Sequence, residues 1–390
     1  MSEPDTAPAT PQAAIAEAAS PVRDIGDGRR VQPGLALCLS GGGYRAMLFH
    51  LGALWRLNEL GFLPRLDRVS SVSGGSITAG ALGHGWSQLD LDERGIAGEF
   101  VAAVVDPVRG LAGRTVDIPV VLLGALLPGS IGDRLAGSYA RHLFGDSTLQ
   151  DLPDRPRFVF NATNLQSGVL WRFSKPFMAD YRVGTVEHPT VRLAVAVAAS
   201  SAFPPVLSPV RPRLELDDYA SGQGTLTGEE YRRRPMLTDG GVYDNLGLET
   251  AWKRYDTVLV SDGGGQYQPQ PNVKANWLLQ TRRVIGTIDS QVRSLRKRQV
   301  IGGLAVGARE GAYWSIWSEV ADFRLADAID APDRRAKELA RLSTRLKKLD
   351  ARTQERLVNW GYAICDTAIR KFVRPGAPRP ARLPYPEAGI

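Results

Sequence analysis

Residues 34–45 read GLALCLSGGGYR, and this stretch indicates the fold class. The run from Leu35 to Leu39 is apolar throughout, which is typical of a strand buried on both faces. A helix-like stretch from about Ala46 to Leu60 follows the glycines. Glycines between a strand and a helix let backbone N–H groups point into open space, so the loop favours an anion site. The alternatives are a tight turn or a dinucleotide loop, although three consecutive glycines do not fit G-x-G-x-x-G.

A second glycine turn lies about thirty residues later, where the chain reads SVSGG over residues 71–75. It follows a predicted strand, Arg68 to Val72, and precedes a stretch of small apolar residues that predicts a helix. This is the context of a nucleophile elbow, which would expose the Ser73 hydroxyl. The pattern departs from G-x-S-x-G because Ser71 replaces the first glycine. A plain Ser/Gly turn with a helix cap is the alternative interpretation.

Two later stretches place an aspartate on a glycine turn after a predicted strand. Asp239 stands in TDGGVYDN, and Asp262 stands in SDGGG. Either carboxylate would reach a neighbouring site from such a turn, and a common Asp-Gly turn is the alternative. Spacing does not choose between the two.

Strands alternating with helices predict a three-layer α/β domain with a mostly parallel central sheet. Further strands are expected at 157–160, 169–173, 236–238 and 257–261, and a helix at 189–199. Residues 1–33 are rich in Ala and Pro and predict a disordered tail. The catalytic domain is expected over 34–275 and a basic, helical C-terminal extension over 276–390, with Leu339, Leu342, Leu346 and Leu349 at helical spacing.

Composition limits the class of protein. The 390 residues carry a formal charge of +7, which suits an anionic membrane surface or nucleic acid. No nucleic-acid-reading motif accompanies the basic residues, so a nucleic-acid partner is not expected. Two cysteines far apart predict neither a disulfide framework nor a metal site, and they favour a reducing cytoplasm. No apolar run reaches the roughly 18 residues of a membrane span, and the N-terminus lacks the features of a secretory signal.

Taken together and in order, the three glycine motifs resemble those of patatin-like phospholipases. LSGGGYRAM over residues 39–47 is similar to the cytosolic phospholipase A2 branch of that family. The resemblance continues through LFGDSTLQDLP, FVFNATNLQSGVLWRF and AVAASSAFPPVLSPV, and covers roughly residues 34–265.

This resemblance implies a patatin-like fold and a serine lipid acyl hydrolase without a cofactor or metal, acting on fatty-acyl esters of glycerophospholipids. It implies Ser73 as nucleophile and Asp239, rather than Asp262, as base. The implied oxyanion hole is Gly42, Gly43 and Gly74, and Arg45 matches the family's arginine beside the loop, which implies substrate binding. The alternatives are a neutral-lipid hydrolase or transacylase with the same dyad, or a catalytically silent lipid-binding module.

The histidines and two further segments bear on mechanism and lipid access. None of the four histidines lies after the acidic motif, where an α/β-hydrolase histidine would come, which agrees with a Ser-Asp dyad. Ile118 to Leu127 is an apolar run that predicts a lid or, alternatively, a buried helix. A basic cluster is expected to face a membrane beside the Ser73 opening, making the enzyme a peripheral membrane protein; a solvated helix face is the alternative. Its members are Arg282, Arg283, Arg293, Arg296, Lys297 and Arg298.

Overall fold

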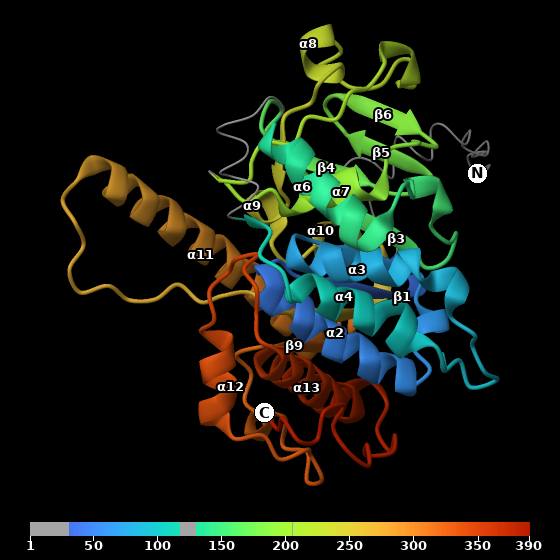
Figure 1. The fold of residues 1–390 in the computed structure, drawn as a ribbon, viewed down its shortest axis with the longest axis vertical. Helices are drawn as coiled ribbons and strands as arrows, with labels where there is room; N and C mark the ends of the chain where they lie inside the picture. Colours follow the sequence, from blue (N-terminus) through green and yellow to red (C-terminus); the bar gives the residue numbers. More distant parts are fainter. Residues whose placement is uncertain (1–30, 118–129, 205) are drawn as a thin grey trace, which may run out of the picture.

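The computed structural model describes residues 31–117, 130–204 and 206–390, and its centre is a nine-stranded sheet (Figure 1). The order is β6-β5-β4-β3-β2-β1-β8-β9, and β7 pairs with β3 off this path. The strands are β1 (Gln32–Leu39), β2 (Arg68–Ser71), β3 (Arg157–Asn164), β4 (Val169–Phe173), β5 (Phe177–Asp180), β6 (Gly184–Glu187), β7 (Leu237–Asp239), β8 (Tyr255–Asp262) and β9 (Glu310–Ser315).

The central strands β3, β2, β1, β8 and β9 are parallel to one another, as the sequence predicts. Strands β4, β5 and β6 add an antiparallel ribbon on the far side of β3. Parallel neighbours need crossovers, and helices supply them.

The helices are α2 (Gly43–Glu59), α3 (Gly74–His84), α4 (Asp106–Ala112), α6 (Ile131–Tyr139), α7 (Leu193–Ser201), α8 (Glu229–Arg232), α9 (Gly241–Asp244), α10 (Glu249–Trp252), α11 (Trp277–Ala305), α12 (Asp333–Ala340) and α13 (Ala351–Ala368). Successive packing contacts link α13 to α2, α2 to α3, and α3 to α7. Helix α10 contacts β1, β2 and β8. The long helix α11 projects from the body of the molecule (Figure 1).

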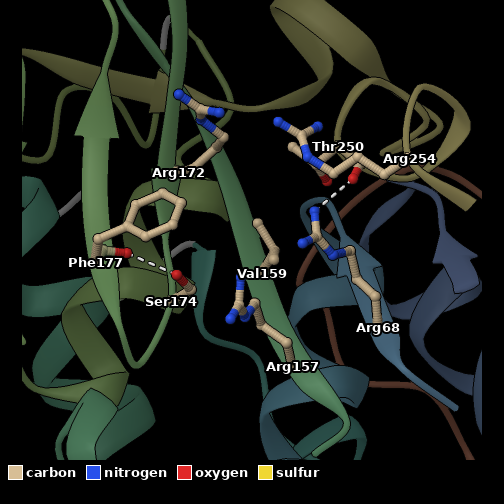
Figure 2. A pocket seen from close by; sticks show the side chains of 8 residues that line it. All are labelled: Arg68, Arg157, Val159, Arg172, Ser174, Phe177, Thr250 and Arg254. Atoms are coloured by element: carbon tan, nitrogen blue, oxygen red, sulfur yellow. Dashed lines mark hydrogen bonds between the residues drawn. The ribbon is translucent and has the colours of Figure 1, made fainter. Parts of the chain in front are cut away.

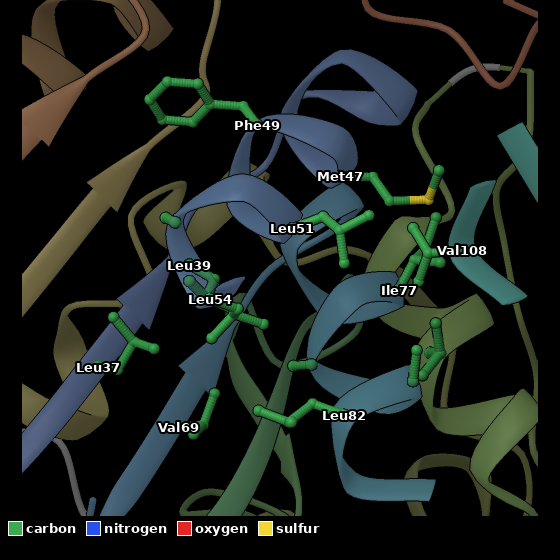
Figure 3. Close-up of a cluster of buried hydrophobic side chains, with 14 of the residues drawn as sticks. Leu37, Leu39, Met47, Phe49, Leu51, Leu54, Val69, Ile77, Leu82 and Val108 are labelled. Carbon is green, nitrogen blue, oxygen red and sulfur yellow. The ribbon is translucent and has the colours of Figure 1, made fainter. Parts of the chain in front are cut away.

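Strand β1 shows why helices cover both faces of the sheet. Its leucines at 35, 37 and 39 belong to the large core, and Figure 3 shows two of them beneath α2 and α3. Its alternate residues Ala36 and Cys38 belong to a second core with α10 and Val300 of α11. Side chains alternate along a strand, so a continuous apolar run requires apolar partners on both sides.

The region after residue 275 contributes to the same core. Strand β9 extends the sheet, and α13 crosses α2 at a pair of glycines. A Cβ at position 361 would lie 1.8 Å from the carbonyl oxygen of Phe49, and one at position 52 would lie 1.9 Å from that of Val358. Glycine at both positions therefore lets the two backbones touch.

Three local expectations differ from the structure. Leu342, Leu346 and Leu349 lie outside any helix, because α12 ends at Ala340 and the backbone of 345–346 bonds to Tyr44 and Val116 instead. Helix α7 begins at Leu193 rather than 189. Strands β5, β6 and β9 were not expected. The predicted lid, 118–127, and most of the predicted tail lie outside the described residues.

Candidate active site

Ser73 occupies a sharp turn between β2 and α3. Its φ of 53° and ψ of −120° are costly for a residue with a side chain, and such strain is concentrated at functional sites. The turn is possible because the next two residues are glycines. A Cβ at position 74 would lie 2.2 Å from the carbonyl oxygen of Gly43, and one at position 75 would lie 2.4 Å from that of Leu39. Ser71, where a glycine was expected, fits as the last residue of β2.

Strand β3 brings this turn next to Asp239. Strand β2 pairs in parallel with the first half of β3 and ends with Ser71 opposite Phe160. Strand β7 runs antiparallel along the second half and ends with Asp239 opposite Ala162. Because β4 occupies the other edge of β3, β2 and β7 share one edge and their carboxyl ends meet there. Two positions along a strand are only about 7 Å, so Ser73 and Asp239 become neighbours.

The Asp239 carboxyl has the surroundings that a candidate base requires. Its Oδ1 accepts the Gly241 amide at 2.7 Å. Its Oδ2 is buried and makes no hydrogen bond of good geometry within the described residues. Burial raises the pKa of Asp239 to about 6, against the lowering effects of the nearby Ser73 hydroxyl, the Gly241 amide and Arg293. A carboxyl with a pKa near neutrality and a spare oxygen suits proton transfer from a hydroxyl.

Asp262, the rival aspartate, is held in an ion pair. Its Oδ1 accepts the Gly264 amide, and its Oδ2 accepts the Tyr313 hydroxyl and the Lys297 ammonium, each at 2.8 Å. Although Asp262 is buried, the charge and hydrogen bond of Lys297 hold its pKa well below the usual range. These contacts favour a structural role for Asp262 and leave Asp239 as the better candidate base.

The three predicted oxyanion-hole residues lie together. Gly42 and Gly43 have φ values of 149° and 61°, which favour glycine. Gly74 is packed against Gly43. Among the described residues, none accepts a hydrogen bond from the amides of these three glycines. Unpaired amides beside the nucleophile, at the first turns of α2 and α3, are suited to hold a developing negative charge.

Ser200 and Asn161 complete the surroundings of the elbow. The Ser200 hydroxyl accepts the Ser73 amide at 3.1 Å and donates to the carbonyl oxygen of Asn161 at 2.6 Å. The Asn161 side chain donates to the carbonyl oxygen of Ser71 at 2.9 Å. Both residues lie in stretches that carry the family resemblance, AVAASSAF and FVFNATN, although sequence reasoning gave neither a role.

The Arg45 guanidinium is hydrogen-bonded to other parts of the chain. Its Nε donates to the carbonyl oxygen of Gly263 at 3.2 Å, and its other nitrogens bond to Leu342 and Thr344. Substrate binding by Arg45 stays a prediction, and these contacts favour a role in holding the C-terminal segment against the glycine loop.

His50 is the histidine nearest the glycine loop, and its contacts are structural. Both ring nitrogens are hydrogen-bonded, to the Ser261 hydroxyl at 2.8 Å and to the carbonyl oxygen of Ser40 at 2.9 Å. Burial lowers its pKa to about 4, so the ring is neutral at physiological pH. An engaged, neutral imidazole fits the expectation that the histidines are not the base.

A separate cavity lies at the opposite ends of the central strands. Figure 2 shows its four arginines, Arg68, Arg157, Arg172 and Arg254. Arg68 and Arg157 begin β2 and β3, whereas Ser73 follows the carboxyl end of β2. Burial lowers the pKa of Arg68 to about 10. This cavity is therefore not the Ser73 site.

No group of three or more His, Cys, Asp or Glu among the described residues is arranged to hold a metal ion. Within the same residues, no helix is both long and apolar enough to cross a membrane.

Comparison with known families agrees with this geometry. The sequence model of patatin-like phospholipases matches residues 37–252, more than half of the chain, including the glycine loop, the elbow and the Asp239 turn. The chain belongs to the patatin-like phospholipase family. The predicted three-layer α/β fold and the predicted family are thereby confirmed. No curated protein shows significant sequence similarity to the chain.

Solved structures with a similar fold include a human cytosolic phospholipase A2. Human GIVD cytosolic phospholipase A2 is 13% identical with a TM-score of 0.51, and the alignment covers 90% of this chain and 64% of that one. The same enzyme in complex with methyl gamma-linolenyl fluorophosphonate and terbium chloride is 15% identical with a TM-score of 0.51, covering 91% of this chain and 61% of that one. This chain thus spans less than two thirds of that enzyme, and the likeness concerns the fold.

Proposed function

We propose that this patatin-like chain is a serine lipid acyl hydrolase that cleaves fatty-acyl esters of glycerophospholipids. One observation carries the proposal: strained Ser73 lies beside a buried aspartate whose pKa is about 6 and beside glycine amides that have no acceptor among the described residues. A nucleophile, a base and oxyanion donors at one point are the parts that acyl transfer requires.

The proposed reaction has two stages. The Ser73 oxygen attacks the ester carbonyl while Asp239 takes the hydroxyl proton. The resulting oxyanion accepts hydrogen bonds from the backbone amides of Gly42, Gly43 and Gly74. Collapse breaks the ester bond, and the proton from Asp239 leaves with the lysophospholipid alcohol. Water then attacks the acyl-enzyme while Asp239 takes its proton. Collapse breaks the acyl–Ser73 bond, Asp239 returns the proton to the Ser73 oxygen, and the fatty acid departs.

The substrate implies the place of action. Phospholipid esters lie at the surface of a bilayer, so we propose peripheral attachment to a membrane. A cytoplasmic location stays a prediction, supported by the buried and unpaired state of both cysteines.

Labelling by an alkyl fluorophosphonate tests the nucleophile. Peptide mass spectrometry should find the adduct on Ser73 alone, and Ser73→Ala should lose both labelling and hydrolysis of a water-soluble ester. Labelling that persists in Ser73→Ala would contradict the assignment.

Paired aspartate variants test the base. Asp239→Asn should reduce ester hydrolysis by about 10³-fold or more while thermal stability is retained, because an amide cannot accept the proton and burial already disfavours the charge. Asp262→Asn should instead lower the free energy of unfolding by about 1–3 kcal/mol, because Lys297 and Tyr313 lose an anionic partner. The reverse pattern would make Asp262 the base.

Lipid mass spectrometry tests the substrate class. Wild-type protein incubated with mixed phospholipids and triacylglycerols should release fatty acids and lysophospholipids, whereas Ser73→Ala should not. Release from triacylglycerol alone would favour the neutral-lipid alternative.

A further inference from the structure

Helix α11 carries a continuous apolar stripe on its outer side. The seven residues of this stripe follow helical spacing and have side-chain exposures from 40% to 74%. They are Trp277, Leu278, Val284, Ile285, Ile288, Val292 and Leu295. The span from 277 to 295 is about 27 Å at the rise of an α-helix. Large apolar side chains gathered on one face mark an interaction surface, whereas isolated ones do not.

The other side of α11 carries most of its charged residues and is fixed to the protein. Near the C-terminal half, Arg296 pairs with Glu249 at 2.9 Å and Lys297 with Asp262 at 2.8 Å. Near the tip, Arg283 stacks on Tyr267 at 4.0 Å from the ring centre and bonds to the carbonyl oxygen of Gln268. These contacts fix the rotation of the helix, so that its apolar stripe faces outward. Four of the six residues of the predicted basic cluster, Arg283, Arg293, Arg296 and Lys297, are thus engaged within the protein.

The base of α11 lies next to the active site. Arg293 donates to the carbonyl oxygen of Gly265 at 3.0 Å. Arg293 and Asp289 are both close enough to Asp239 to influence its pKa. Other large apolar residues near the site are also exposed: Val242, three residues after Asp239, at 52%, and Phe203, three residues after Ser200, at 54%. The apolar stripe therefore starts near the catalytic residues and leads away from them.

We propose that the outer face of α11 lies in the surface of an anionic phospholipid bilayer and holds the Ser73 site against it. For the identity of the substrate, this inference rests on the proposed function. An apolar face with a tryptophan, combined with an arginine-rich polar side, is the composition of a helix that lies in the membrane interface. Of the six cationic residues from Arg282 to Arg298, Arg282 and Arg298 are exposed, and the same stretch has one acidic residue, Asp289. The exposed positive charge complements anionic lipid.

A lipid surface fits the stripe better than a second copy of the chain does. A two-helix seam needs apolar residues at every a and d position. If Trp277 occupies one of these positions, the others are 281, 284, 288, 291, 295 and 298. Three of them hold the polar residues Thr281, Gln291 and Arg298, so the apolar seam would be interrupted. The flanking residues Ile285 and Val292 widen the stripe instead. A wide face suits a broad apolar surface.

Vesicle sedimentation tests the proposal in the full chain carrying Ser73→Ala, which prevents hydrolysis during the assay. The probe is vesicles of equal parts phosphatidylcholine and phosphatidylglycerol. The pair I285Q/I288Q should weaken binding about tenfold or more, because two isoleucine side chains lose their apolar burial. Gln keeps helix propensity, so the helix should persist. The matched control T287Q/S294Q places the same side chain at two exposed polar positions of α11 and should bind as the parent does.

Charge and catalysis give two further readouts. R282Q/R298Q should weaken binding to the anionic vesicles and leave binding to pure phosphatidylcholine unchanged. With Ser73 restored, I285Q/I288Q should lower vesicle hydrolysis about tenfold or more and leave hydrolysis of a water-soluble ester unchanged.

Two outcomes would overturn the proposal. One is parental vesicle binding by I285Q/I288Q. The other is lipid-free self-association in sedimentation velocity that I285Q/I288Q abolishes, since the stripe would then contact a second copy. If wild-type protein hydrolyses no ester but I285Q/I288Q still loses vesicle binding, the proposed function fails and the docking surface stands.

Discussion

At the scale of single residues, two aspartates in the same D-G-G context differ in chemistry because their neighbours differ. Asp239 is buried and forms no ion pair within the part of the chain that the structure describes, and burial raises its pKa to about 6. Asp262 is equally buried, but Lys297 lies 2.8 Å away and its pKa falls. Desolvation favours the protonated form, whereas a neighbouring cation favours the ionised form. The distinction between base and ion-pair partner thus lies in one lysine from α11.

The pKa of Asp239 predicts the pH dependence of the reaction. Below about pH 6 the carboxyl is protonated and cannot take the Ser73 proton, so kcat/KM for a soluble ester should rise with pH and level off above about pH 7. Initial rates measured from about pH 5 to about pH 8 would show this acidic limb of the pH–rate profile. Buried His50 cannot produce it, because its pKa is lowered to about 4. His188→Gln, which removes an exposed imidazole, should keep the limb. A flat profile would argue against Asp239 as base.

At the scale of elements, the site depends on where strands end rather than on where residues lie in the sequence. Ser73 and Asp239 are far apart along the chain, and the shared edge of β3 joins them. The C-terminal turn of α7 then supports the junction, because the Ser200 hydroxyl contacts both the Ser73 amide and the carbonyl oxygen of Asn161.

Two neighbouring serines of α7 separate positioning from stability. Ser200→Ala should lower kcat about tenfold or more, because the elbow loses the group that fixes its backbone. Ser201→Ala removes hydrogen bonds to Tyr139 and to the carbonyl oxygen of Val197 rather than to the elbow, so it should spare kcat. Each should cost about 1–3 kcal/mol in the free energy of unfolding, measured by chemical denaturation. If the two variants lowered kcat equally, Ser200 would have only a structural role.

At the scale of the whole molecule, the C-terminal part completes the domain that begins at β1. The contact between α2 and α13 depends on Gly52 and Gly361, which let backbone meet backbone. Arg345 reinforces this closure, because its carbonyl oxygen accepts the Tyr44 amide beside the glycine loop. Weaker packing of α13 against α2 should therefore also disturb the position of the glycine loop in the active site.

A glycine pair tests that closure. Gly361→Ala should lower the free energy of unfolding by about 3 kcal/mol or more, because its Cβ would lie 1.8 Å from a carbonyl oxygen and the helices must separate. At Gly137 in α6, an added Cβ would have no neighbouring atom within 4 Å. Gly137→Ala should therefore raise the free energy of unfolding by about 0.5–1 kcal/mol. Chemical denaturation measures both. A Gly361→Ala protein as stable as wild type would mean that α13 packs loosely.

The local pattern of the sequence determined four of the parallel core strands, β1, β2, β3 and β8, together with the glycine loop, the elbow and two candidate aspartates. Each depends on residues close together in the chain, such as the apolar run of β1 or the glycines after Ser73. Only the tertiary structure decided which aspartate meets Ser73, because strand register and Lys297 are long-range. It also placed Leu342 to Leu349 outside a helix, where backbone contacts with Tyr44 and Val116 outweigh a leucine pattern. It turned the apolar side of α11 outward, because Glu249 and Asp262 hold the basic side.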